Sequence, residues 1–284
     1  MYRYGTSSNQ SSFRSTAPLS NDEIARYAPS VLADAAHESR GERYTFIPTI
    51  SVIDGLRREG FQPYEVRQTR VRDQSKRDHT KHLVRLRHET SITSNDEVPE
   101  IILINSHDGT SSYQLLSGIF RFVCSNGLIA GDVCNDIRVR HSGNVVDDVI
   151  EGATRILDDA DQVIDRIGTY KAITLSDDEQ RVFANAALSL RWDEGQAPVE
   201  AERLLRPRRY ADNKPDLWTA FNRVQENIIK GGVSGRSTTG RRLSTRAIGG
   251  VTENVKLNRA LWSLADGMAE LKRGVIDIEE LAVV

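Results

Sequence analysis

The sequence predicts an α+β protein, with an antiparallel β-meander flanked by helices and followed by a helical C-terminal portion. Two observations predict this class. Between residues 61 and 124, four segments alternate polar and apolar residues or are continuously apolar, and each contains the β-branched or aromatic residues typical of strands. After Asn144 the apolar residues recur at helical spacing, with acidic residues on the opposite face.

The N-terminal part predicts an arm and then a compact core. Residues 1–20 are rich in Ser, Thr and Asn, which is typical of a flexible arm. Ser20 or Asn21 can then cap a helix whose first turn is acidic. A second short helix is expected to end at Gly60. These helices and the sheet form a predicted core over residues 21–143.

The predicted strands are separated by polar stretches that suit hairpin loops. They are FQPYEVRQTRV, KHLVRLRHE, EIILINSHD and SYQLLSGIFRFVCS, with DIRVRHSG as an extension. Helices are expected over residues 145–170, 176–191, 199–205, 216–230 and 252–272. This helical portion, residues 144–284, is interrupted by a basic loop rich in Gly, Ser and Arg over residues 230–250.

The composition is typical of a soluble protein. The chain has 284 residues, a net charge of −2 and 38% apolar residues, and its mean hydropathy is −0.46. No apolar run approaches the roughly 18–20 residues of a membrane span, and the polar N-terminus lacks a secretory signal, so we expect a cytoplasmic protein without membrane contact. Cys124 and Cys134 are expected to be buried thiols, and no cofactor is predicted.

Charge is segregated along the chain. Residues 57–87 contain ten Lys or Arg against four acidic residues, and residues 203–246 contain eleven against three. Residues 147–194 contain twelve acidic residues against five basic ones. Segregation of this size predicts surface fields that the small net charge hides.

The string Asn105-Ser106-His107-Asp108-Gly109 follows a predicted strand and resembles a hydrolytic triad. Neighbouring residues of an extended chain point to opposite faces, so three consecutive residues cannot form a triad. Asn and Asp instead bond to nearby amides and Gly accepts positive φ, which predicts a turn. A functional contact by Asn105, His107 or Asp108 remains an alternative.

Two further motifs give no support to metal or nucleotide chemistry. His79, His82 and His88 lie close together in the sequence, but no further ligands accompany them, so no metal site is predicted. KGGVSGRST departs from a phosphate-binding loop because Arg236 stands where Lys is required. The flexible basic loop can still contact a phosphate backbone, and a solvated linker is the alternative.

Several strings resemble known families. INSHDGTSSYQL, FRFVCSNGL, RHSGN, WTAFNRVQENIIKGG and NRALWSLADGM resemble the phage- and plasmid-like family known as domain of unknown function 932, over roughly residues 40–270. That resemblance implies relatives on mobile elements and no particular reaction. Residues 43–88 are similar in layout to the start of phage single-strand annealing proteins of the Erf and RecT kind. This similarity implies an oligomer that holds single-stranded DNA in a basic groove.

We therefore predict a non-catalytic, nucleic-acid-binding protein that binds or anneals single-stranded DNA in recombination or replication, as a homo-oligomer. The cations expected to contact phosphates are Arg67, Arg70, Arg85 and Arg87 on the strands and Lys230, Arg236, Arg241, Arg242 and Arg246 on the loop. Tyr64 and Tyr113 are the rings expected to stack on bases.

Two other functions stay open at this point. The first is an enzyme acting on nucleic acid, with a polar site at strand ends formed by His107, Asp108, Asn126 and His141. The second is a host-defence antagonist that binds protein through the acidic helices of residues 147–194.

Overall fold

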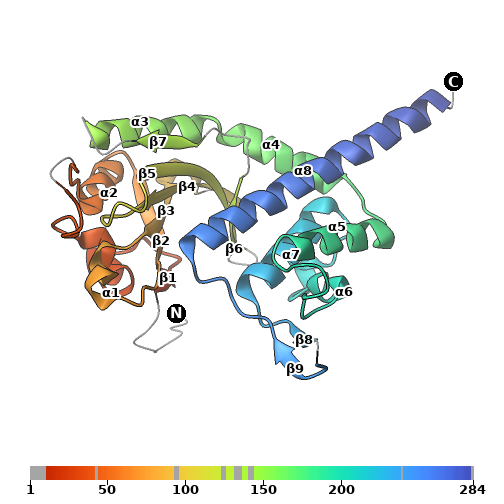
Figure 1. The fold of residues 1–284 in the computed structure, drawn as a ribbon. Coiled ribbons are helices and arrows are strands. Elements are labelled where there is room, and N and C mark those ends of the chain that lie inside the picture. Colours follow the sequence, from red (N-terminus) through yellow and green to blue (C-terminus); the bar gives the residue numbers. More distant parts are fainter. Residues whose placement is uncertain are drawn as a thin grey trace. The chain divides into compact units, whose positions relative to one another are not determined.

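The computed structural model confirms the α+β class (Figure 1). It describes residues 11–41, 44–92, 96–122, 126–130, 136–139, 144–237 and 239–282. The chain forms two compact units. The first, here called the sheet unit, comprises Met1–Phe120, Cys134–Asp158 and Gly249–Val251, and the second, the helical unit, comprises Arg121–Val133, Asp159–Ile248 and Thr252–Val284.

The strands follow the predicted meander. They are β1 (Ser12–Arg14), β2 (Phe61–Gln68), β3 (His82–His88), β4 (Glu97–Asn105), β5 (Tyr113–Arg121), β6 (Asn126–Ile129) and β7 (Ile137–Val139). Their order is β1-β2-β3-β4-β5-β6, with β7 paired to β5. β1 pairs antiparallel with β2, so part of the segment that the sequence assigns to a flexible arm is an edge strand of the sheet.

A β-bulge in β2 decides which side chains enter the core. The register changes from Pro63 opposite Leu86 to Glu65 opposite Arg85, which leaves Tyr64 as the extra residue. Because of this shift, Phe61 and Val66 both belong to the core although their numbers differ in parity. Glu65 and Arg85 consequently share the opposite face of the sheet.

Three α-helices belong to the sheet unit: α1 (Asn21–Tyr27), α2 (Thr49–Arg58) and α3 (Val145–Asp158). Short 3₁₀ helices cover Pro29–Leu32, Gln74–His79 and Glu89–Ser91. Ser20 caps α1: its hydroxyl accepts from the amide of Glu23 at 3.3 Å, and the Glu23 carboxylate accepts from the amide of Ser20 at 2.9 Å. The chain leaves α2 through Gly60 at φ 85°.

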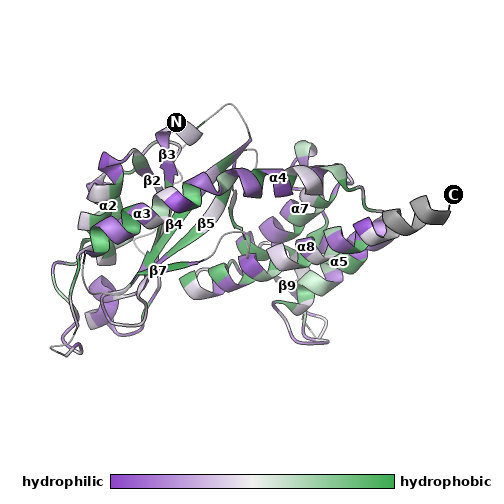
Figure 2. Ribbon diagram, turned by 90° about the horizontal axis from the view of Figure 1, so that it is seen from above, coloured by the Kyte–Doolittle hydropathy of each residue, from purple (hydrophilic) through white to green (hydrophobic). Residues whose placement is uncertain are grey.

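The core of the sheet unit lies between the helices and one face of the sheet. Val52, Leu56 and Val149 from α2 and α3 join Val84 and Leu103 from β3 and β4 in one buried cluster. Figure 2 shows both hydrophobic (green) and hydrophilic (purple) residues along α2 and α3, as expected for helices with one buried side. The predicted boundary near residue 143 differs from this grouping, because α3 packs on the sheet.

The helical unit contains α4 (Ala160–Ala172), α5 (Asp177–Ser189), α6 (Ala201–Leu204), a 3₁₀ helix (Tyr210–Asp212), α7 (Leu217–Lys230), β8 (Ser234–Arg236), β9 (Arg242–Ser244) and most of α8 (Val251–Ala282). Its core includes an aromatic group in which Trp218 stacks on Phe221 at 5.5 Å between ring centroids and Trp262 contacts both rings. Among the described helices of the chain, none is long and apolar enough to cross a membrane.

Candidate functional site

The chain turns after β4 by the hydrogen bonds that the sequence predicts. The amide of Thr110 donates to Oδ1 of Asp108 at 3.0 Å, and Gly109 has φ 78°, where a side chain would be strained. The hydroxyl of Ser106 accepts from the amide of Ser111 at 2.8 Å. Burial alone would raise the pKa of Asp108, but the hydrogen bonds from Thr110 hold it below its usual value. These side chains therefore hold the turn together.

Asn105 and His107 point into a buried polar network centred on Thr49. The Thr49 hydroxyl lies 2.9 Å from Nε2 of His82, 3.0 Å from Nδ2 of Asn105, 3.1 Å from Nε2 of His107 and 3.2 Å from the hydroxyl of Tyr113. A hydroxyl carries one hydrogen, so it can donate to only one of the two imidazoles and must accept from the other. The network thereby restricts the tautomers of both histidines.

Burial keeps His82 neutral. It lowers the pKa of His82 to about 4, although a hydrogen bond to the carbonyl of Thr80 acts in the opposite direction. Nδ1 of His82 lies 2.9 Å from the hydroxyl of Ser30. Thr49, His82 and His107 are each fully buried, so their polar atoms face one another and not solvent, which supports a structural role for this network.

Two residues of the enzymatic interpretation remain to be placed. Asn126 begins β6, and His141 lies outside the described residues. Within the described part of the chain, no group of three or more His, Cys, Asp or Glu residues is arranged to hold a metal ion.

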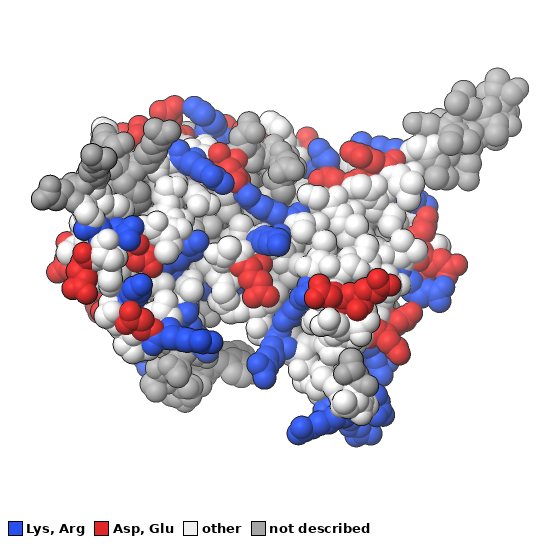
Figure 3. Space-filling model, in the orientation of Figure 1, with Lys and Arg blue, Asp and Glu red and all other residues white. Residues whose placement is uncertain are grey.

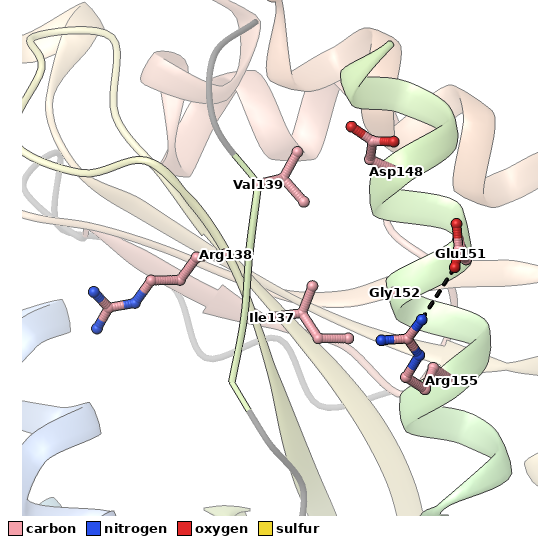
Figure 4. Close-up of a pocket in the computed structure, with 7 residues that line it drawn as sticks. All are labelled: Ile137, Arg138, Val139, Asp148, Glu151, Gly152 and Arg155. Atoms are coloured by element: carbon pink, nitrogen blue, oxygen red, sulfur yellow. Dashed lines mark hydrogen bonds and ion pairs between the residues drawn. The ribbon is translucent and has the colours of Figure 1, made fainter. Parts of the chain in front are cut away.

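A pocket of about 400 Å³ lies between β7 and α3 in the sheet unit. It is lined by Ile137, Arg138, Val139, Asp148, Glu151, Gly152 and Arg155. Figure 4 shows Ile137 and Val139 directed toward α3, Arg138 directed away, and the ion pair of 3.1 Å between Arg155 and Glu151. Its described lining contains no histidine, cysteine or hydroxyl group, so it offers no nucleophile or general base of these kinds.

The predicted phosphate contacts on the strands are tied to carboxylates. Arg85 donates to Glu100 at 2.8 Å and lies 3.5 Å from Glu65, and Arg87 donates to Glu100 at 2.9 Å. Arg67 donates to Glu65 at 3.3 Å. We call this group, with Arg14 on β1 and the rings of Tyr64 and Phe120, the sheet arginine cluster.

Most of the sheet arginine cluster is buried, and its arginines form ion pairs with Glu65 and Glu100. The side chains of Arg85 and Arg87 are 3% and 2% exposed, and that of Arg67 is 16% exposed. Burial alone would raise the pKa of Glu65, but the guanidinium groups of Arg14, Arg85 and Arg67 lower it to about 2. In this arrangement the arginines compensate buried carboxylates, and Arg85 and Arg87 do not face solvent where a phosphate backbone could reach them.

The two tyrosines predicted to stack on bases are also buried. Tyr64 lies under the guanidinium of Arg87, which is 4.3 Å from the ring centroid. Tyr113 is fully buried and donates to the carbonyl of Ile47 at 3.0 Å. Arg70, which the sequence places on a strand, lies just after β2; it is exposed and donates to the hydroxyl of Ser11 at 3.1 Å.

The second basic stretch, which we call the basic segment 203–246, has the opposite arrangement. Its three acidic residues are buried and engaged: Asp212 with Arg121 and Arg209, Asp216 as the cap of α7, and Glu226 with Arg209 and Lys230. Eight of its cations are exposed: Arg206, Arg208, Lys214, Lys230, Arg236, Arg241, Arg242 and Arg246. The segment therefore presents almost purely positive charge.

Four of these exposed cations lie on or beside the β8–β9 hairpin. Arg236 pairs directly opposite Arg242, and Arg241 precedes β9. The hairpin packs closely on the preceding chain: the amide of Arg236 donates to the carbonyl of Pro198 at 2.8 Å, and a Cβ on Gly235 would lie 1.9 Å from that carbonyl oxygen. Figure 3 shows blue side chains gathered where Figure 1 places β8 and β9.

The last turn of α7 joins the hairpin to residues 204–209. Asn227 donates to the carbonyls of Leu204 at 2.8 Å and Arg206 at 3.0 Å, and it accepts from Arg208 at 2.8 Å. Arg208 also donates to the carbonyl of Gly231, where the chain leaves α7 for the hairpin. Two stretches that are about 20 residues apart in the sequence are thus held at one end of α7.

Comparison with known proteins identifies the family. The model of the family "Domain of unknown function (DUF932)" matches residues 36–262. The chain belongs to the DUF932 family. The UPF0380 protein YafZ of Escherichia coli (strain K12) is 51% identical over 255 residues, covering 90% of this chain and 93% of the relative. The UPF0380 protein YfjQ of the same strain is 51% identical over 253 residues, covering 89% and 92%. No solved structure matches the chain significantly.

The DUF932 match covers all the nucleic-acid-binding residues that the sequence predicts, but the sequence missed three features of their surroundings. The sequence does not indicate Glu100 as a partner of Arg85 and Arg87, because strand pairing sets that contact. The sequence predicts a loop where the structure has the β8–β9 hairpin. Tyr210, in the basic segment, is 95% exposed, which no local pattern of the sequence indicates.

Proposed function

We propose that this DUF932 protein binds nucleic acid, most concretely single-stranded DNA, through the basic segment 203–246 and without catalysis. The observation that carries the proposal is the sorting of charge in that segment, where every acidic residue is buried while eight cations are exposed. A surface of this kind fits a polyanion, because each exposed guanidinium offers a fork of donors to phosphate oxygens. Strand protection or annealing during recombination or replication is the process that we propose.

The hairpin gives this proposal a second support. Arg236 and Arg242 are directly opposite each other across β8 and β9, and like charges in that position destabilise a hairpin. An anion held between the two guanidinium groups would remove the repulsion. This arrangement is therefore better suited to a bound state than to the free protein.

The proposal revises which residues make the contacts. We assign phosphate contacts to Arg236, Arg241, Arg242 and Arg246, which are exposed, and a lesser role to Lys230, which pairs with Glu226 at 2.8 Å. Arg67, Arg85 and Arg87 are left out because carboxylates of the sheet hold them. We also propose that the protein self-associates, which sizing of the free protein by light scattering would measure.

The test is fluorescence anisotropy of labelled 20-nucleotide single-stranded and double-stranded DNA, titrated with protein at several salt concentrations. In the triple variant Arg236→Ala/Arg241→Ala/Arg242→Ala, affinity for the single strand should fall at least tenfold at low salt. The slope of log K against log[salt] should decrease in magnitude by about 2, because each lost phosphate contact contributes about 0.7 for single strands.

A matched control removes three exposed arginines elsewhere, in the triple variant Arg26→Ala/Arg155→Ala/Arg181→Ala. The two triple variants have the same net charge. If binding depends on the basic segment 203–246 and not on net charge, the control should keep the wild-type affinity within about threefold. Equal losses in both variants would show that only net charge matters. Absence of binding by the wild type at low salt would refute the proposed function.

A further inference from the structure

Among the described residues, Tyr210 is the most exposed aromatic side chain. Its relative exposure is 95%. A ring that remains in water gains no burial energy, so the folding of the chain does not account for an aromatic residue at this position. The ring is, however, a flat and sequence-independent surface of the kind on which nucleobases stack.

The backbone around Tyr210 is fixed on both sides. On one side, Arg209 donates to the Glu226 carboxylate at 2.9 and 2.6 Å. On the other side, Asp212 accepts from Arg121 at 2.6 Å and is also bonded to Arg209. Tyr210 therefore projects from a short 3₁₀ helix whose ends are held by ion pairs with buried carboxylates, and little backbone freedom is lost when a ligand contacts the ring.

The same ion pairs place the ring in cationic surroundings. The carboxylates of Glu226 and Asp212 are buried. They form ion pairs with Arg209, Lys230 and Arg121. Exposed cations flank the ring in the sequence, at Arg206, Arg208 and Lys214. Arg208 in turn contacts Gly231 at the base of the hairpin. Tyr210 thus lies between exposed cations along the chain.

We infer that Tyr210 is a stacking platform for an unpaired base of a single strand whose phosphates are held by the basic segment 203–246. The inference rests on the proposed function and adds a reason for strand selectivity. A duplex keeps its bases stacked on one another, so it can use the cations but not the ring. A single strand can use both.

The experiment compares three labelled 20-mers: oligo-dT, an abasic strand of the same phosphate count, and a duplex. Each is titrated with wild-type protein, Tyr210→Ala and Tyr210→Phe. One stacked base is worth about 1–3 kcal/mol, or about 5- to 150-fold in affinity. Tyr210→Ala should lose affinity for oligo-dT by a factor in that range and keep the wild-type affinity for the abasic strand and the duplex. Tyr210→Phe should bind all three like the wild type.

The controls separate the possible failures. The melting temperature should be unchanged in both variants, because the ring is exposed. If the wild type binds all three strands and Tyr210→Ala binds oligo-dT equally well, the stacking role is wrong while the basic surface stands. Equal losses for oligo-dT and the abasic strand would likewise overturn stacking. If the wild type binds none of the three at low salt, the proposed function and this inference both fail.

Discussion

The sheet arginine cluster and the basic segment 203–246 both come from stretches of sequence with a large excess of Lys and Arg, but the fold treats them in opposite ways. In the sheet unit, strand pairing brings Glu65 and Glu100 against the arginines and buries both carboxylates together with Arg85 and Arg87. In the helical unit, the acidic residues of the segment turn inward and most of the cations remain in solvent.

The difference shows what a local charge excess can and cannot predict. The carboxylate partners of the sheet arginines include Glu100, which lies outside the basic stretch in the sequence. In the basic segment, the acidic residues Asp212, Asp216 and Glu226 lie inside the stretch itself, but they are buried and already bonded. Sequence charge alone therefore ranks the two stretches as equal candidates, whereas their pairing makes the first structural and the second a candidate surface.

The largest expected effect concerns the carboxylate that holds two buried arginines. Glu100→Gln removes its charge and leaves Arg85 and Arg87 in the interior, so the free energy of unfolding should fall by about 3–5 kcal/mol. Urea unfolding measures the change. The control Glu151→Gln, which breaks an exposed pair on α3, should change it by less than about 0.5 kcal/mol. A loss below about 1 kcal/mol for Glu100→Gln would contradict the structural role of the cluster.

The next effect concerns pH and the interior of the sheet unit. The pKa of His82 is about 4 in the fold and about 6.5 when unfolded. The unfolded chain therefore binds an additional proton between these values, and stability falls as pH decreases from 6.5, by ~3 kcal/mol at pH 4. The pKa of Glu65 is about 2 in the fold against an ordinary value of 4.5, so the stability that Glu65 contributes is lost as pH falls below about 4.5.

Unfolding by urea at pH 5.0, 5.5, 6.0 and 6.5 isolates the histidine contribution. His82→Gln should flatten the dependence of stability on pH in that range. If the variant keeps the wild-type slope, another group titrates there and the assignment to His82 is wrong.

A smaller effect is expected at the centre of the polar network. Thr49→Val keeps the shape but removes the hydroxyl shared by His82, Asn105 and His107, so unfolding should become easier by about 1–3 kcal/mol. Thr49→Ser keeps the hydroxyl and should lose less. Equal stabilities of the two variants by thermal and urea unfolding would show that the network does not depend on this hydroxyl.

The smallest effect has the opposite sign and separates the two regions most sharply. Arg242→Glu converts the like-charge pair with Arg236 into an opposite-charge pair, which should stabilise the protein by about 0.2–1 kcal/mol. The same change should weaken binding of single-stranded DNA in the anisotropy assay. Arg242→Ala serves as the intermediate case. Destabilisation by Arg242→Glu would mean that Arg242 supports the fold as the sheet arginines do.

The sequence predicts much of this fold for physical reasons that are local. Alternation in KHLVRLRHE predicts β3, and the Asp108-Gly109 pair predicts the turn that the Thr110 amide closes. Ser20 is one of the two caps expected for the first helix, and it is the one used. Each of these features depends on residues within a few positions of one another.

The missing parts depend on long-range pairing. The bulge at Tyr64 reverses the parity of β2, so counting residues from Phe61 would place Glu65 in the core. β8 and β9 contain Gly, Ser and Arg, which carry little strand propensity, and the contact with Pro198 helps to position them. Next to the exposed Tyr210, Arg209 is held by Glu226, 17 residues away. No local pattern encodes these contacts.

The amide of Asn227 has a consequence for how tightly a long ligand could be held. The side chain of Asn227 fixes residues 204–208 beside the end of α7. The cations of that stretch and those of the β8–β9 hairpin are therefore joined by hydrogen bonds and not by a flexible linker alone. Once a strand is attached at one point, the second point meets it at a high effective concentration, without a search through solution. Two individually weak contacts held in this way can together give a high affinity.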